Sequence, residues 1–263
     1  MARQERAIRT KLAILNAAAA VFDERGYEAA TIGEVLTRAG VTKGALYFHF
    51  PSKQALAEGV LSQQFANVAV ERQACRLQEF VDTGLLVAYR MRRDPMVSAV
   101  ARLSLEQDMS TQFGTAALTQ WIETSQYLLH EAKGQGELLP HVDPAESAWL
   151  FSAAWTGVQV FSQILEGREG LEARVVMLFE HLLPAIAVPA VLNRLIITAD
   201  RAAELGAAGS RAADRPDRPE PSERLDGSAP DALAERDTEA GQDRDGGRAN
   251  GRSGRAGQVQ ATL

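Results

Sequence analysis

Apolar side chains recur at helical spacing along the first part of the chain and divide it into amphipathic segments. In residues 5–25 they fall at intervals of three and four, which predicts one long helix, at Ile8, Leu12, Leu15, Ala19 and Phe22. A shorter segment shows similar spacing, with Ile32, Val35, Leu36 and Ala39. Gly26 and Gly40 follow the two segments, and glycine tolerates the left-handed conformation that ends many helices.

Capping residues mark where the next helices begin. Thr31 and Glu34 stand in the T-x-x-E order of a capping box, in which each side chain hydrogen-bonds the backbone N–H of the other residue. Thr42 caps a third helix of barely two turns, and Ser52 caps a fourth. Two short helices joined by a three- or four-residue turn that contains glycine form a helix-turn-helix.

The third helix has the side chains that a helix entering the DNA major groove needs. Thr42, Lys43 and Gly44 lie at its N-terminal end, where small residues allow close approach and Lys43 can reach guanine acceptors. The alternative is a tight turn between two core helices. Phosphate contacts are expected from Tyr47, His49 and Lys53, with Thr31 and the basic arm at Arg3 and Arg6 as further candidates.

Residues 14–56 contain three sequence motifs. They are A-x-x-x-F-x-x-x-G-Y from Ala18 to Tyr27, T-I-x-E-V from Thr31 to Val35, and A-G-V-x-K-G-x-L-Y-x-H-F-x-S-K from Ala39 to Lys53. Together they resemble the N-terminal DNA-binding domain of the TetR family of transcriptional repressors. That resemblance implies a homodimer that binds a pseudo-palindromic DNA operator.

Within that family the chain is more narrowly similar to the gamma-butyrolactone autoregulator receptors, which control antibiotic production and morphological development. The similarity lies in Arg3–Ala7, in Val41–Phe50 and in Trp121 within a Gln-Trp-Ile setting. It implies a repressor of secondary metabolism that a small lactone releases from DNA, with Trp121 against the ligand. The alternative is a pseudo-receptor or a ligand-blind regulator of the same family, responding to another small molecule such as an antibiotic or its intermediate.

The rest of the chain also shows helical periodicity, without sustained β alternation, so the expected fold is all-α. The expected domains are a helix-turn-helix domain (1–52), a helical ligand-binding and dimerisation domain (53–205) and a disordered low-complexity tail (206–263). A helix over residues 53–80 should connect the first two domains. Further helices are expected at 85–92, 96–107, 111–132, 144–165, 171–183 and 188–205.

Two features of the second domain bear on function. The helix over 144–165 is apolar most of the way round, so one side should pack in the domain and the other against a second subunit. Trp121 shares its helix with Leu118, Ile122 and Ser125 and should point inward. From the residues alone, it is either a core residue or a wall of a ligand site.

Composition narrows the classes of protein. The net charge is −6, while residues 1–53 have eight basic and five acidic side chains, a modest positive excess. The single cysteine, Cys75, cannot form an internal disulfide. The histidines of the second domain lack metal spacing and a neighbouring nucleophile motif, so we expect no enzyme, metal or cofactor. No stretch reaches the length of a membrane span and no secretory signal is evident, so a cytoplasmic location is expected.

Overall fold

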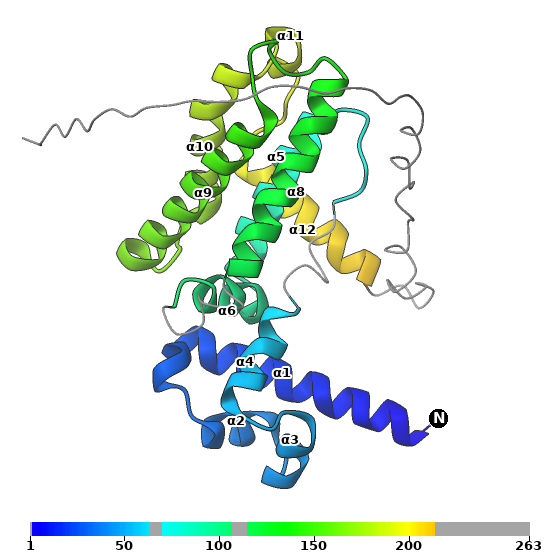
Figure 1. Cartoon of the computed structure of the whole chain (residues 1–263), viewed down its shortest axis with the longest axis vertical. Coiled ribbons are helices and arrows are strands. Elements are labelled where there is room, and N and C mark those ends of the chain that lie inside the picture. The colour runs from blue at the N-terminus through cyan, green and yellow to red at the C-terminus, as the bar shows by residue number, and fades with distance from the viewer. Residues whose placement is uncertain (1, 64–69, 107–114, 214–263) are drawn as a thin grey trace, which may run out of the picture. The chain divides into compact units, whose positions relative to one another are not determined.

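The computed structural model describes residues 2–63, 70–106 and 115–213, which form a head (α1–α4) and a body (α5–α12) (Figure 1). The described residues contain no β-strand, only an isolated antiparallel bridge between Leu138 and Ala187. The expected all-α fold is therefore confirmed. No helix of the described part is long and apolar enough to cross a membrane.

The head contains four helices whose ends follow the sequence signals. They are α1 (Ala2–Ala29), α2 (Ile32–Ala39), α3 (Lys43–His49) and α4 (Lys53–Leu61). α1 is interrupted at Gly26, which has φ 79° and ψ 172°, so regular helix ends where the glycine predicted. The Thr31–Glu34 capping box is formed, and Gly40 ends α2 with φ 63°.

The N-terminal half of α1 does not have the predicted packing. Leu15, Ala19 and Phe22 are buried in the head core, but Ile8 is 53% exposed and Leu12 is 47% exposed. Figure 1 shows the reason: the first turns of α1 extend past the other helices of the head. Helical periodicity predicted the helix correctly but could not show where its neighbours end.

The predicted continuous helix over residues 53–80 is wrong. α4 ends at Leu61, and α5 (Arg76–Met91) begins a new helix. The buried carboxylate of Glu137 accepts hydrogen bonds from the backbone N–H groups of Arg76 at 3.1 Å and Leu77 at 2.7 Å. A helix start can thus be buried here because a distant side chain satisfies its free N–H groups. Residues 64–69, part of the predicted helix, lie outside the described residues.

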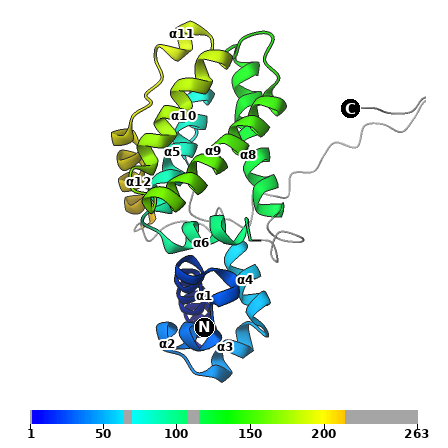
Figure 2. The same cartoon turned by 90° about the vertical axis from the view of Figure 1, so that its left-hand side faces the viewer.

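The body is built around α5, which contacts α6, α8, α10 and α12. Its other helices are α6 (Pro95–Leu103), α8 (Thr115–Gly134), α9 (Pro144–Glu166), α10 (Leu171–Ile186), α11 (Pro189–Leu192) and α12 (Ala199–Ala213) (Figure 2). The core contains an aromatic cluster, in which the ring centroid of Phe151 lies 4.4 Å from that of Phe80 and 5.2 Å from that of Phe179. The predicted helix start at Pro144 is confirmed, whereas the helix predicted from residue 96 begins one residue earlier, at Pro95; the preceding aspartate caps each helix.

α6 belongs to both parts of the molecule. Its buried residues Ala99, Val100 and Leu103 pack in the hydrophobic core of the head, with side chains of α1 and α4. It also contacts α5 of the body. The head is therefore attached to the body through a shared core as well as through the chain.

The C-terminal part differs from expectation in two ways. The predicted helix over residues 188–205 is divided into α11 and α12, because Gln78 fixes the intervening segment: its Oε1 accepts from the Ile196 N–H at 2.8 Å. Arg201 then joins α12 to the buried Asp82 of α5 at 2.6 Å. α12 continues through Ala213, so residues 206–213, assigned to the tail, are helical. Residues 214–263 lie outside the described residues, and their disorder stays a prediction.

Glu137 provides a test of this arrangement. Replacing it by Ala leaves the first N–H groups of α5 buried without acceptors, which should lower the free energy of unfolding by ~1–3 kcal/mol. Chemical denaturation measures the change. Glu123→Ala, at an exposed position on α8, is the control and should stay within ~0.5 kcal/mol of the parent. Equal midpoints for both variants would contradict the capping role.

Candidate DNA-binding surface and ligand cavity

α3 is held in the head by one buried side chain and presents its other residues outward. Leu46 is fully buried in the head core. The Oγ1 of Thr42 accepts a hydrogen bond from the Ala45 N–H at 3.3 Å and so caps the helix. Lys43, Gly44 and Tyr47 are exposed. The helix therefore offers a basic, narrow N-terminal end to a partner.

The exposed face of α3 has open space beside Gly44 and an exposed aromatic side chain, Phe48. A Cβ added to Gly44 would meet no atom within 4 Å, so nothing inside the protein requires a glycine there. Phe48 is 82% exposed, and its ring lies edge-on to that of His49 with centroids 5.1 Å apart. Sequence reasoning missed Phe48, although its position next to Tyr47 on a two-turn helix was a usable signal.

The other side chains predicted to contact DNA differ in whether they already have partners within the protein. The Lys53 ammonium donates to the Glu28 carbonyl at 3.0 Å and lies 4.6 Å from the centroid of the Tyr27 ring. Thr31 is occupied by its capping box, and its hydrogen bonds lower the pKa of the Glu34 carboxyl. Both side chains thus have structural partners, whereas Lys43 only lies 5.9 Å from the Tyr47 ring centroid.

The basic arm lies on the exposed first turns of α1. Arg6 is exposed there, and the side chain of Arg3 is outside the described part of the structure. The arm is thus on the head, like α3, but on a different helix. Its predicted contact with DNA stays a prediction.

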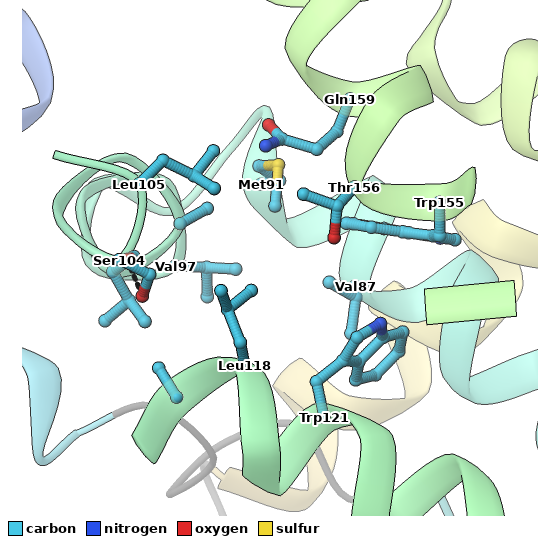
Figure 3. A pocket seen from close by; sticks show the side chains of 13 residues that line it. Val87, Met91, Val97, Ser104, Leu105, Leu118, Trp121, Trp155, Thr156 and Gln159 are labelled. Atoms are coloured by element: carbon cyan, nitrogen blue, oxygen red, sulfur yellow. Dashed lines mark hydrogen bonds between the residues drawn. The ribbon is translucent and has the colours of Figure 1, made fainter. Parts of the chain in front are cut away.

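A narrow cavity opens in the body between α5, α6, α8 and α9 (Figure 3). The centre of a water molecule can reach about 80 Å³ of it, within about 590 Å³ of space between atoms that includes its mouth. Most of its wall is apolar. The lining residues are Val87, Met91, Val97, Val100, Ala101, Ser104, Leu105, Ala117, Leu118, Trp121, Trp155, Thr156 and Gln159.

Two indole groups that border the cavity have unsatisfied hydrogen-bond donors. Trp121 is 8% exposed, and its ring centroid lies 5.5 Å from that of Trp155. The Nε1 atoms of both tryptophans are buried without a hydrogen-bond partner. A buried N–H without an acceptor is costly, so an oxygen acceptor that came within reach of either indole would be stabilised.

The second wall of the cavity was not identified from the sequence. Trp155 and Gln159 are four residues apart on α9, so they lie on the same face of that helix. Both point toward the space that Trp121 borders (Figure 3). The i, i+4 spacing was a usable signal, but only the fold shows that this face of α9 meets α8 and α6.

α9 carries large exposed apolar side chains near both of its ends, here called the α9 patch. Its five residues are between 54% and 74% exposed: Trp149, Leu150, Phe161, Ile164 and Leu165. α9 and α10 lie next to each other on this side of the body (Figure 2). Apolar patches of this kind on a single subunit mark sites of association.

Comparison with known proteins gives consistent results. Residues 14–60 match the family model described as bacterial regulatory proteins, tetR family. The chain is 40% identical over 195 residues to the A-factor receptor protein of Streptomyces griseus, a match that covers 74% of this chain and 70% of that protein.

Solved structures support the same assignment. TylP, a TetR regulator from Streptomyces fradiae, aligns with a TM-score of 0.71 and 43% identity, covering 78% of this chain and 99% of TylP. A gamma-butyrolactone receptor described as ArpA-like aligns with a TM-score of 0.60 and 25% identity, covering 77% of this chain and 98% of the receptor. The chain therefore belongs to the TetR family of bacterial regulatory proteins, and it is a transcriptional repressor that resembles the gamma-butyrolactone receptors.

Proposed function

We propose that this repressor binds a pseudo-palindromic operator as a homodimer and leaves it when a gamma-butyrolactone enters the body cavity, in the control of secondary metabolism. The observation that supports this most directly is the apolar cavity with two unpartnered indole N–H groups, in a body that shares its α6 with a DNA-binding head. An acyl-lactone has a slender alkyl chain for the apolar walls and oxygen acceptors for the indoles.

DNA reading is assigned to the N-terminal end of α3. Lys43 and Gly44 are exposed there, and the space in front of Gly44 is open to a base edge or phosphate. Lys43 reads bases, while Thr42, Tyr47 and His49 contact the backbone. Lys53 contacts a phosphate and also has a structural role, because its ammonium joins the start of α4 to the end of α1.

The homodimer is assigned to the α9 patch. A two-turn recognition helix contacts only a few base pairs, so a second head is needed for specific binding, and two-fold symmetry supplies it. The same patch on both subunits would be self-complementary, as a two-fold interface requires. Met177 of α10, which is also exposed, extends the surface.

Ligand release follows from the width of the cavity. Pockets for drug-sized molecules occupy roughly 300–1,000 Å³, whereas about 80 Å³ is open here to the centre of a water molecule. The lactone must therefore bind a state in which the walls have moved apart. Because it prefers that state, it shifts the population toward it. α6 is one of those walls, so it replaces the mistakenly predicted long helix as the route to the head.

Lys43 gives the first test. Lys43→Ala should weaken binding to a selected operator by ~1–3 kcal/mol and relax the preference among bases, because it removes the base-reading group. Lys53→Ala should weaken all sequences about equally and reduce the salt slope by roughly one. Fluorescence anisotropy with matched and altered duplexes measures both. Unchanged preference in Lys43→Ala would assign base reading to another residue.

The dimer gives the second test. Replacing Phe161 and Ile164 by Glu places charges in the α9 patch and should yield a monomer that has lost operator binding. Tyr127→Ser removes another exposed aromatic side chain, from α8, and should leave the dimer intact. Sedimentation velocity at micromolar concentration measures the oligomeric state of both variants. A dimer in the double variant would move the interface to another face.

Trp121 gives the third test. Trp121→Phe keeps an aromatic wall and loses the indole N–H, so the affinity for an α-octanoyl-γ-butyrolactone should fall about two- to tenfold. Trp121→Ala should abolish release while operator affinity and dimerisation change little. Tyr127→Phe, at an exposed position on the same helix but outside the cavity, is the control. Lactone titrations of the operator complex, with thermal melts beside them, measure these effects.

The outcomes of the lactone experiment separate the alternatives. Normal release from Trp121→Ala, or a collapsed melting temperature, would show that the residue is structural. A parent protein that the lactone neither binds nor releases would favour the ligand-blind regulator or a receptor for another molecule. If a cell extract then releases the protein from its operator, the protein is a receptor for another molecule; if it does not, the protein is a ligand-blind regulator.

A further inference from the structure

Arg168, in the turn between α9 and α10, combines a strained backbone with a buried charge. Its φ is 65°, in the left-handed region that residues other than glycine rarely adopt. The residue is 6% exposed, and arginine is seldom buried this far unless it is paired. Burial lowers the pKa of its guanidinium, and the nearby Asp23 offsets part of that shift. Both features cost free energy, so its contacts should have a function.

The guanidinium contacts three helices. Its Nη1 donates to the Ser98 hydroxyl of α6 and lies 3.8 Å from the Asp23 carboxylate of α1. The Ser98 hydroxyl in turn donates to the same Asp23 oxygen. Its Nη2 lies 3.5 Å from the Gln159 Oε1 of α9, a long hydrogen bond. Arg168 therefore connects the head with two walls of the cavity.

Gln159 is the member of this cluster that a ligand can reach. It is buried and lines the cavity beside Thr156 (Figure 3). It also borders, with Arg168 and Asp23, a cleft between α1, α6 and α9, so the guanidinium has space in which to move. The buried Nε of Arg168 has no hydrogen-bond partner. The present contacts thus leave the guanidinium only partly satisfied.

We propose that Arg168 is a positioning residue that transmits ligand binding from Gln159 in the cavity to Asp23 in the head. This inference rests on the proposed function. A ligand oxygen or hydroxyl that hydrogen-bonds the Gln159 amide turns that amide away from Arg168. A buried guanidinium that loses an acceptor must find another, and the nearest carboxylate is that of Asp23. The movement changes how the end of α1 is held against α6.

The test measures coupling separately from binding. In the parent protein, α-octanoyl-γ-butyrolactone should weaken operator binding at least tenfold, and operator DNA should weaken lactone binding by the same factor. In Arg168→Asn, whose side chain tolerates a positive φ, that factor should fall below about threefold. Each separate affinity should stay within about threefold of the parent. Anisotropy reports the operator, and indole fluorescence reports the lactone.

Three variants keep the result interpretable. Asp23→Asn removes the charge from the head side, and the double variant should show no further loss of coupling, because both changes break one link. Arg194→Asn, at an exposed position near the C-terminal helices, should behave as the parent. Parent-like coupling in Arg168→Asn would overturn the proposal. So would a uniform loss of both affinities together with melting temperature, which a merely structural arginine would give.

A measurement without ligand separates this inference from the proposed function. Operator DNA should alter amide hydrogen exchange in residues 155–168 of the parent protein, because coupling acts in both directions. Arg168→Asn should lose that response. If the lactone fails to bind but this response appears and depends on Arg168, the proposed ligand is wrong and the relay stands. An absent response in the parent, or an equal one in the variant, would overturn the relay.

Discussion

The packing of α6 is the constraint on which the rest of the structure depends. Nine residues, Pro95–Leu103, must satisfy two environments at once. Ala99 and Leu103 fill the core of the head, while Val97 and Ala101 border the body cavity, and Val100 contributes to both. Close-packed side chains cannot be displaced on one face of so short a helix without moving the other. A displacement of α6 in the cavity wall would therefore also disturb the head core.

This constraint also explains why the cavity is narrow. A wide empty cavity would remove packing partners from α6 and so weaken the head core. A molecule that widened the cavity would have to supply the free energy for this loss of packing through its own contacts. To move a two-state equilibrium from 1:99 to 99:1, a ligand needs about 5.5 kcal/mol of differential affinity for the favoured state. Apolar walls and two unsatisfied indoles can supply free energy of that order.

The sequence predicted features that short segments determine. Glycine and capping residues located the helices of the head, and the helix predicted from residue 144 does begin there, as α9. The predictions were wrong where a residue distant in sequence determines a helix boundary. Glu137, 60 residues from Leu77, accepts a hydrogen bond at the start of α5. Gln78, 118 residues from Ile196, binds the segment that separates α11 from α12. The predicted burial of Ile8 and Leu12 was wrong for a related reason: periodicity shows that a helix has an apolar face, but not whether other helices cover it.

The two candidate sites also differ in whether one short segment or several distant segments form them. The DNA-binding candidates lie in one short segment with a shared motif, so the amino-acid sequence alone is enough to name them. The cavity takes side chains from four helices, and the sequence pointed only to Trp121 among them. Cavity residues such as Thr156 and Gln159 can change without altering the head motif, so ligand preference can vary while the DNA-binding surface is kept. The head sequence therefore identifies the family, and the ligand must be inferred from the cavity.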